Sequence, residues 1–255
     1  MNSRLLAPLG FAIGLFMIAP LLVMLLFAFS SSSLLKLPIE GLTFHWFFAL
    51  TETQGFYPSL VNSLLIALTV GAASTVIGTL AAFGLTAGRH RLRNVSMPVL
   101  VLPLLVPPLV LGIVFLSYFS GLGFRLGLHT TIIAQTVTLQ PIVILILASR
   151  LAGFDWATVD SARDLGASPR RVFIDIIFPV IRPTILGAAL IVMALSLDDF
   201  IITFFTIGGE NTLPTLLWGM MRKGVDPRMN ACAFILVSLT LLMGSLALRL
   251  TRTRN

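Results

Sequence analysis

Two adjacent aspartates, Asp198 and Asp199, stand in a strongly apolar stretch, LSLDDFIITFF, at residues 195–205. A carboxylate inside a bilayer costs on the order of 2.5 to 3.5 kcal/mol unless it faces a wet cavity or a cation. Successive residues point about 100° apart on a helix, so we expect only one of the two to line such a cavity. The pair therefore either offers a carboxylate to a cationic group or forms a helix-end cluster bonded to an Arg or to backbone N–H groups.

A charged segment, DSARDLGASPRRVFIDIIFPVIRP, precedes these aspartates at residues 160–183 and carries seven formal charges and three prolines. Its pattern predicts a hairpin of two short helices. Asp155 is suited to cap the first helix, which runs from Trp156 to about Leu165, and Gly166 is suited to the left-handed conformation that follows a helix end.

The second helix of the predicted hairpin begins after Ser168, a suitable N-cap, with Pro169 at its first position. We expect Pro179 and Pro183 to limit its far end. Each helix has an apolar stripe at helical spacing. The stripe residues are Trp156, Val159, Ala162 and Leu165 in the first helix and Val172, Phe173, Ile176 and Ile177 in the second. Either the rest of the chain or a soluble partner must cover these stripes.

The composition places both features in a membrane protein. The chain is 57% hydrophobic and 11% charged, with a mean hydropathy of +1.00, which a soluble domain rarely shows. Runs of roughly 17 to 25 apolar residues predict membrane-spanning helices. Six are expected, at Leu9–Ser30, Leu60–Ala87, Met97–Phe119, Thr131–Leu151, Thr184–Ile207 and Ala231–Leu250. The fold class predicted is an all-α polytopic membrane bundle, with the hairpin between the fourth and fifth spans.

The distribution of Lys and Arg predicts the orientation of the bundle, because loops that stay in the cytoplasm are enriched in them. Six spans place both termini on one side. If that side is cytoplasmic, so is the hairpin, and most of the 17 basic residues lie there. The cytoplasmic ones are Arg4, Arg89, Arg91, Arg93, Arg150, Arg163, Arg170, Arg171, Arg182, Arg249, Arg252 and Arg254. Those left outside are Lys36, Arg125, Arg222, Lys223 and Arg228.

The hairpin carries a motif of a known family. Asp160, Ser161 and Ala162, followed after three residues by Gly166 and after nine more by Ile176, Phe178 and Pro179, resemble the EAA motif, Glu-Ala-Ala-x3-Gly-x9-Ile-x-Leu-Pro. That motif is found in permease subunits of binding-protein-dependent ABC importers. The spacing agrees throughout, and the three substitutions keep size or charge class. The resemblance implies a type I ABC importer fold in which this hairpin, the coupling helix, sits in a groove of a cytoplasmic ATPase.

The residues that the resemblance assigns to ATPase contact are Asp160, Ser161, Ala162, Leu165, Gly166, Ala167, Ser168 and Arg170. Other phrases look like the spermidine/putrescine subgroup, and more like the second permease of its pair. They are NSLLIAL (62–68), LPLLVPPLVLGI (102–113), LSLDDFIITFF (195–205), TLP (212–214) and GVDPRMNA (224–231). The solute implied is small and cationic or amine-containing; relatives for amino acids, opines or aminophosphonates share these phrases.

The resemblance implies a complex in a bacterial inner membrane. Its members are this chain, a homologous second permease, two copies of an ABC ATPase and a periplasmic or lipid-anchored binding protein. No phosphate loop of the form GxxxxGK[ST] occurs in the sequence, so we expect no catalysis or cofactor in this chain, with ATP and Mg²⁺ bound by the ATPase. His45, His90 and His129 are far apart in sequence, and no metal site or nucleic-acid partner is expected.

The sequence divides into no separate domains. We expect one transmembrane domain over residues 1–255, with a core at about 58–250, a first span and outer loop at 1–57 and a coupling loop at 152–183. Candidates for the solute path or gate are Asp198, Asp199, Pro107, Gln135 and Gln140. The prolines 103, 107 and 108 break the third span or merely kink it. The two glutamines hydrogen-bond solute or bond across helices.

Two other classes of function remain open at this point. In a proton-coupled secondary transporter, Asp198 and Asp199 carry protons and no ATPase binds. In a membrane assembly subunit, the chain transports nothing. The first predicts uptake that collapses with the proton gradient but survives ATP depletion, and the second predicts no dependence of uptake on the chain.

Overall fold

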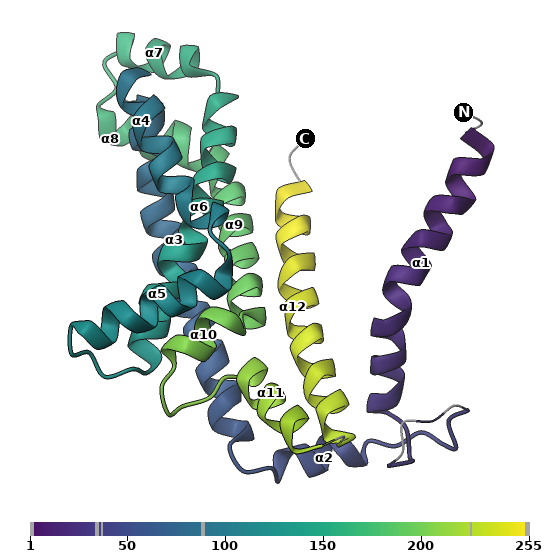
Figure 1. Cartoon of the computed structure of the whole chain (residues 1–255). Coiled ribbons are helices and arrows are strands. Elements are labelled where there is room, and N and C mark those ends of the chain that lie inside the picture. Colours follow the sequence, from purple (N-terminus) through teal and green to yellow (C-terminus); the bar gives the residue numbers. More distant parts are fainter. Residues whose placement is uncertain (1–2, 34–35, 37, 88–89, 225, 253–255) are drawn as a thin grey trace.

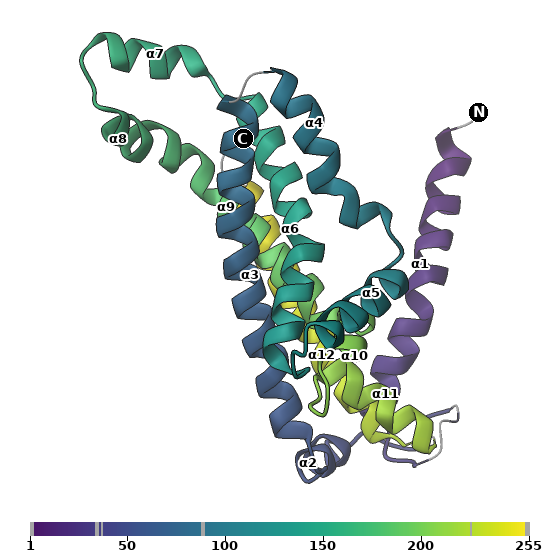
Figure 2. The ribbon, with the colours of Figure 1, turned by 60° about the vertical axis from the view of Figure 1, so that its left-hand side comes forward.

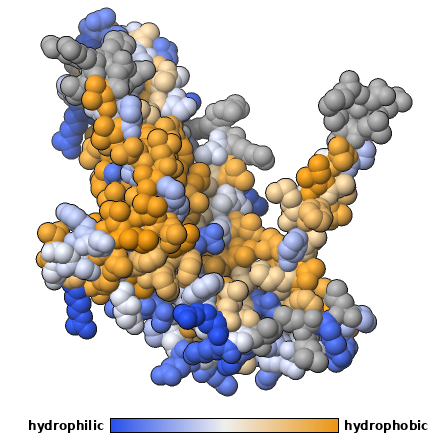
Figure 3. Space-filling view, viewed as in Figure 1, coloured by the Kyte–Doolittle hydropathy of each residue, from blue (hydrophilic) through white to orange (hydrophobic). Residues whose placement is uncertain are grey.

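Long apolar runs become long helices because in lipid every backbone N–H and C=O must be paired within its own segment. The computed structural model describes residues 3–33, 36, 38–87, 90–224 and 226–252, which form the helical bundle of Figures 1 and 2. Five of the described helices are long and apolar enough to cross a membrane, and a sixth candidate is a bent pair. Figure 3 shows an apolar band over the middle of the bundle, with hydrophilic residues toward both ends.

The helices follow one another as α1 (Ser3–Ala28), α2 (His45–Thr51), α3 (Phe56–Ala87), α4 (His90–Val101), the 3-10 turn η1 (Leu102–Leu105), α5 (Pro108–Gly121), α6 (Leu128–Ala152), α7 (Trp156–Asp164), α8 (Pro169–Val172), the π-helical turn η2 (Phe173–Ile177), α9 (Phe178–Asp198), α10 (Ile201–Thr206), α11 (Leu213–Lys223) and α12 (Arg228–Arg252). The start of α1 and the end of α12 point toward the same end as α7 and α8, here called the hairpin end (Figure 1). Helices α2 and α11 lie at the opposite end.

Helices α3, α6 and α9 form the centre of the bundle, with α12 packed on α9. Small residues allow the close approach that helix packing in lipid depends on. A Cβ added at Gly78 of α3 would lie 2.7 Å from the Cβ of Val143 in α6. Another at Gly71 would lie 2.4 Å from Cγ of Met193 in α9. The buried core around these contacts includes Val70 and continues to the foot of the hairpin.

Helix α1 is attached to the bundle at one end. Its apolar length is almost wholly uncovered by the rest of the chain, and in Figure 1 it diverges from α12 toward the hairpin end. At the opposite end, the ring of Phe29 lies 5.1 Å from that of Phe47 in α2 and 5.0 Å from that of Phe234 in α12. The indole N–H of Trp46 donates to the carbonyl of Ser30 at 2.7 Å.

The third predicted span is not one straight helix. The apolar run at Met97–Phe119 is a bent pair, residues 95–105 followed by 108–121, with an angle of 99° between the two parts. The break falls at Val106 and Pro107, where the backbone is extended. Pro107 and Pro108 cannot donate backbone hydrogen bonds, which accounts for the break. Of the two alternatives left open by the sequence, a break and a simple kink, the structure shows the break.

The fifth span was predicted with the wrong bounds. It does not run over Thr184–Ile207, because a continuous helical run from Pro169 to Asp198 includes the second helix of the hairpin. Pro179 and Pro183 do not end that helix: Pro179 lies in the first turn of α9 and Pro183 inside it. The π-helical turn η2 directly precedes α9, and such local adjustments satisfy carbonyls that a proline leaves unpaired.

The remaining spans, α1, α3, α6 and α12, agree with prediction to within four residues at each end, except that α1 begins at Ser3, six residues before the predicted Leu9. Of the basic residues assigned to the cytoplasm, Arg89 and Arg254 lie outside the described residues. The side chains of Arg4, Arg91, Arg93 and Arg252 also lie outside the described part.

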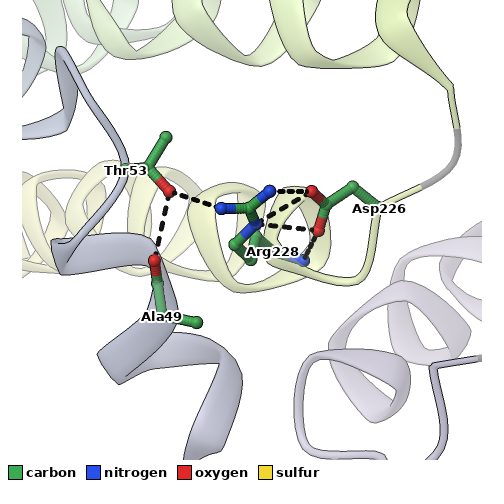
Figure 4. Close-up of polar contacts among 4 residues, drawn as sticks. All are labelled: Ala49, Thr53, Asp226 and Arg228. Carbon is green, nitrogen blue, oxygen red and sulfur yellow. Dashed lines mark hydrogen bonds and ion pairs between the residues drawn. The ribbon is translucent and has the colours of Figure 1, made fainter.

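Arg228, at the start of α12, forms an ion pair with Asp226 and a hydrogen bond to Thr53 in the turn between α2 and α3 (Figure 4). The Arg228 guanidinium donates to both carboxylate oxygens of Asp226, with Nε 2.8 Å from Oδ2, and its Nη1 donates to Thr53 Oγ1 at 3.2 Å. Thr53 in turn donates to the carbonyl of Ala49 at 3.1 Å. Hydrogen bonds from Arg228 hold the pKa of the Asp226 carboxyl below its ordinary value, although partial burial opposes this.

Asp226→Asn should lower the melting temperature of the protein in detergent by roughly 2–4 °C, since a neutral amide replaces the carboxylate that binds the guanidinium. A carboxyl with a lowered pKa stabilises the fold above its ordinary pKa and loses that effect as the pH falls through the lowered value. The difference between wild type and variant should therefore hold from about pH 5 to about pH 8, begin to fall at about pH 4 and disappear once the pH is below the lowered pKa of Asp226. Glu52→Gln removes an exposed carboxylate next to the same turn and is the matched control. Equal melting temperatures for wild type and Asp226→Asn at neutral pH would contradict this assignment.

Candidate functional site

A cavity of about 560 Å³ lies where α5, α6, α9 and α10 meet. Apolar residues of η1, α5 and α6 form much of its wall, and its polar lining comes from Gln135, Thr138, Asp198 and Asp199. The sequence predicted Gln135 and the two aspartates as candidates, and the structure brings all three together. Size and lining are those of a pocket for a small molecule: mostly apolar, with a few convergent polar groups.

The aspartates reach this cavity because α9 ends there. Asp198 is its last residue, and Asp199 has an extended backbone. The carbonyls of a helix C-terminus carry partial negative charge. The end of α9 and its two carboxylates therefore make one electronegative wall of the cavity.

Asp199 is held by hydrogen bonds from two neighbouring helices. Its Oδ2 accepts the backbone N–H and the hydroxyl of Thr203 in α10, both at 3.0 Å, and the Nε2 of Gln135 in α6, also at 3.0 Å. The other end of the Gln135 amide accepts a hydrogen bond from the Ser196 hydroxyl. Gln135 is only 2% exposed. For Asp199 the structure therefore agrees with the second alternative, a cluster at a helix end, in which the carboxylate is bonded to a backbone N–H and to neutral side chains.

Asp198 differs from its neighbour. Its side chain is exposed and lines the cavity, and it makes no hydrogen bond or ion pair with the described residues. The two carboxylates thus divide: Asp199 is bound within the bundle, and Asp198 is free to meet a group that enters the cavity.

Sequence reasoning missed an aromatic group beside the carboxylates. Phe200 lines the cavity, and its ring lies 5.4 Å from that of Phe204 and 5.3 Å from that of Trp218 in α11. The position of Phe200 directly after the aspartates could have indicated that it lines the same cavity. For Trp218 the sequence held no such indication, because this residue comes from a separate helix.

Two of the predicted path residues stand apart from the cavity. Pro107 directly precedes α5, and Pro103 and Pro108 line the wall in its place. Gln140 is half-buried in α6 and is not part of the lining. Of the two roles considered for the glutamines, Gln135 has the second, because it hydrogen-bonds across helices to Thr203 and to Asp199. Within the described residues, no three His, Cys, Asp or Glu side chains come together as a metal site.

The hairpin has the predicted caps. Asp155 Oδ1 accepts the N–H of Ala157 at 3.1 Å, and Ser168 Oγ accepts that of Arg171 at 3.4 Å. Gly166 has a φ of 83°, the left-handed conformation that favours glycine. The N–H of Ala167 bonds back to the carbonyl of Ala162 at 3.0 Å, which pairs a carbonyl at the end of α7.

The bundle covers part of each apolar stripe and leaves the tip open. Val159 and Val172 are buried, and Trp156 and Ala162 pack against the same core. Leu165 is 90% exposed, because α7 ends at Asp164 and the turn carries Leu165 away from the stripe. Most of the other residues assigned to ATPase contact are also exposed, namely Asp160, Ser161, Gly166, Ser168 and Arg170. Ala162 and Ala167 are half-buried.

Comparison with known proteins gives the family. Residues 74–254 match the model of the family described as binding-protein-dependent transport system inner membrane component. The putrescine transport system permease protein PotI of Escherichia coli K12 is 32% identical over 247 residues, which cover 94% of this chain and 86% of PotI. The spermidine/putrescine transport system permease protein PotC of the same strain is 30% identical, with 91% and 88% covered.

The fold also matches a solved structure. A chain of a bacterial alginate ABC transporter, crystallised with an alginate pentasaccharide-bound periplasmic protein, has a TM-score of 0.70 at 16% identity. The match covers 98% of this chain and 96% of that one. The fold is therefore that of ABC importer permeases, as the sequence resemblance implied. On the family match and the identity to PotI and PotC, this chain belongs to the inner membrane components of binding-protein-dependent transport systems.

Proposed function

We propose that this chain is the permease subunit of an ATP-driven importer for a small amine-bearing solute, polyamine-like, delivered by a binding protein. The observation that carries the proposal is the free carboxylate of Asp198 in an otherwise mostly apolar cavity. An ammonium group is the natural partner of such a carboxylate, and the ring of Phe200 adds a face that attracts cations. PotI and PotC are named for putrescine and spermidine, which supports the same solute class.

The hairpin is the proposed contact with the ATPase. An exposed Leu165, with Asp160, Ser161, Gly166, Ser168 and Arg170 around it, offers a small apolar tip with a polar rim that suits a groove in a soluble protein. A proton-coupled transporter requires no such surface. Hydrolysis of ATP, with its Mg²⁺, then takes place on the ATPase, and this chain holds no cofactor.

The remaining members of the complex are proposals as well. A second permease and two ATPase copies complete it, with a periplasmic or lipid-anchored binding protein opposite the hairpin. The chain is inserted in a bacterial inner membrane with its termini and hairpin in the cytoplasm, as the Lys and Arg distribution predicts. Residues 1–255 act as one transmembrane domain, with a core at about 58–250, a first span and outer loop at 1–57 and a coupling loop at 152–183.

One helix joins the two working ends of the molecule. The run from Pro169 to Asp198 has 30 residues, a length of about 45 Å. Its first residues belong to the hairpin and its last residue is the cavity carboxylate. Closure of the ATPase dimer displaces the hairpin, and the helix carries this displacement to the cavity. ATP binding favours the outward-open bundle and hydrolysis restores the inward-open one, since the partner contacts the two states differently.

Gly166→Arg should abolish transport and co-purification with the ATPase while the protein stays in the membrane. The substitution puts a long charged side chain into a left-handed turn on the contact surface. Gly166→Asn is the matched control, because Asn tolerates that conformation and adds no charge. Uptake at the wild-type rate by Gly166→Arg would sink the hairpin assignment.

Asp198→Asn should lower uptake of putrescine by the assembled importer about tenfold or more, chiefly through a higher apparent KM, because one charge-assisted bond to the ammonium is lost. Basal ATPase activity should stay within about twofold of wild type. Glu210→Gln removes a carboxylate outside the cavity lining and should leave uptake unchanged. A parallel fall in uptake and basal ATPase for Asp198→Asn would indicate a structural role instead.

A further inference from the structure

Helices α6 and α10 meet along a polar seam, defined here as Thr130, Thr131 and Gln135 of α6 with Thr203 and Thr206 of α10. All five side chains are at most 2% exposed. Hydrogen bonds extend the seam in both directions: Gly127, in the loop before α6, bonds to Thr206, and Gln135 bonds to Asp199 at the cavity. Polar contact of this extent is unusual in a bundle whose other helix contacts are mainly apolar, and polar side chains between membrane helices mark specific contacts.

Three hydrogen bonds from side chains cross the seam, and the backbone N–H of Gly127 donates a fourth to the carbonyl of Thr206 at 3.2 Å. Thr130 Oγ1 donates to the carbonyl of Thr206 at 2.7 Å, and Thr206 Oγ1 lies 3.1 Å from Thr131 Oγ1 as a donor. Gln135 Nε2 donates to Thr203 Oγ1 at 2.8 Å. These bonds fix α10 against α6 and, through Gln135 and Thr203, orient Asp199.

Each seam hydroxyl also has an acceptor close by in its own segment. Thr206 Oγ1 is 2.8 Å from the carbonyl of Ile202. The hydroxyls of Thr130 and Thr131 are 2.8 and 3.2 Å from the carbonyl of Gly127. A hydroxyl that loses its partner across the seam therefore keeps a hydrogen bond. The groups that lose bonds on separation are the Thr206 carbonyl, which accepts from Thr130 and Gly127, and the Gln135 amide, which donates to Thr203.

The other side of α10 is held in a different way. Phe205 fits against the bare backbone of α5 at Gly112, where an added Cβ would lie 2.6 Å from the ring. Ile202 of α10 packs in an apolar cluster with Phe119 of α5 and Ala134 of α6, so it contributes to both interfaces. Parting α10 from α5 would leave a void beside Gly112, with no alternative contact to fill it. Of its two interfaces, the one with α6 is the more easily opened.

We propose that the seam is a releasable latch: α5 and α10 move as one unit away from α6, which widens the cavity, and Thr131, Thr206 and Gln135 are positioning residues for this motion. The cavity lining includes Leu111 of α5, Ile201 of α10 and Gln135 of α6, so movement of α5 and α10 away from α6 enlarges the cavity. That this motion serves transport rests on the proposed function; the latch itself does not.

The latch predicts easier access to the cavity when seam bonds are removed. Thr138 lines the cavity, so Thr138→Cys reports access by its rate of labelling with a hydrophilic maleimide. The background is Cys232→Ser, which removes the native cysteine, in the complex with its ATPase. The double variant Thr131→Val with Thr206→Val keeps the side-chain shapes but lacks both hydroxyls, and its labelling rate at residue 138 should rise about fivefold. The variant Thr206→Ser keeps a hydroxyl at residue 206 and should be labelled at the wild-type rate.

Thr240→Val is the matched control, because the Thr240 hydroxyl bonds only to the carbonyl of Leu236 in its own helix. Its labelling rate should equal that of wild type. Unchanged labelling in the double Val variant, or an equal rise in the Thr240 control, would overturn the latch.

A second experiment holds the latch closed. Thr131→Cys with Thr206→Cys places two thiols where hydroxyl oxygens now lie 3.1 Å apart, and oxidation should stop putrescine uptake until reductant restores it. Continued uptake by fully cross-linked protein would reject the latch. Absence of uptake by the wild-type complex would reject the proposed function instead, and the labelling rates would still test the latch.

Discussion

A carboxylate buried in a bilayer must be hydrogen-bonded, paired with a cation or exposed to water, and the helices around the cavity are arranged to meet that requirement. Asp199 meets it with hydrogen bonds from Thr203 and Gln135. Those bonds begin a new short helix, so α9 stops at Asp198 and α10 turns away from it. The cavity occupies the space beside this break, and Asp198 is left as its free carboxylate.

The same helix α9 gives the cavity a connection to the far end of the molecule. Its continuity through Pro179 and Pro183 joins the hairpin to the cavity without a loop between them. The caps of the hairpin at Asp155 and Ser168 and its turn at Gly166 pair backbone groups that would otherwise fray. The proposed coupling requires that a displacement at the hairpin reaches the cavity through this helix.

Much of this arrangement was predictable from local chemistry. The caps and the glycine turn depend on neighbouring residues only, so sequence identified them correctly, and the apolar runs gave most of the spans. The bounds of the fifth span were wrong because proline is a weaker breaker in a bundle than in water, where no neighbouring groups satisfy the freed carbonyls. Trp218, Thr203 and Thr206 were missed because their partners lie in other helices, and helical periodicity carries no information about such partners.

The central claim is that one rigid helix couples the hairpin to the cavity, and a pair of spin labels tests it most directly. In a Cys232→Ser background, Arg171→Cys and Leu195→Cys label the two ends of that helix, and Arg171→Cys with Leu145→Cys relates its hairpin end to α6; all three sites are exposed. Distances would be measured in the assembled importer without nucleotide and with ATP bound. A rigid coupling helix predicts an unchanged distance within the first pair and a changed distance in the second. A change within the first pair, with the second constant, would contradict the account.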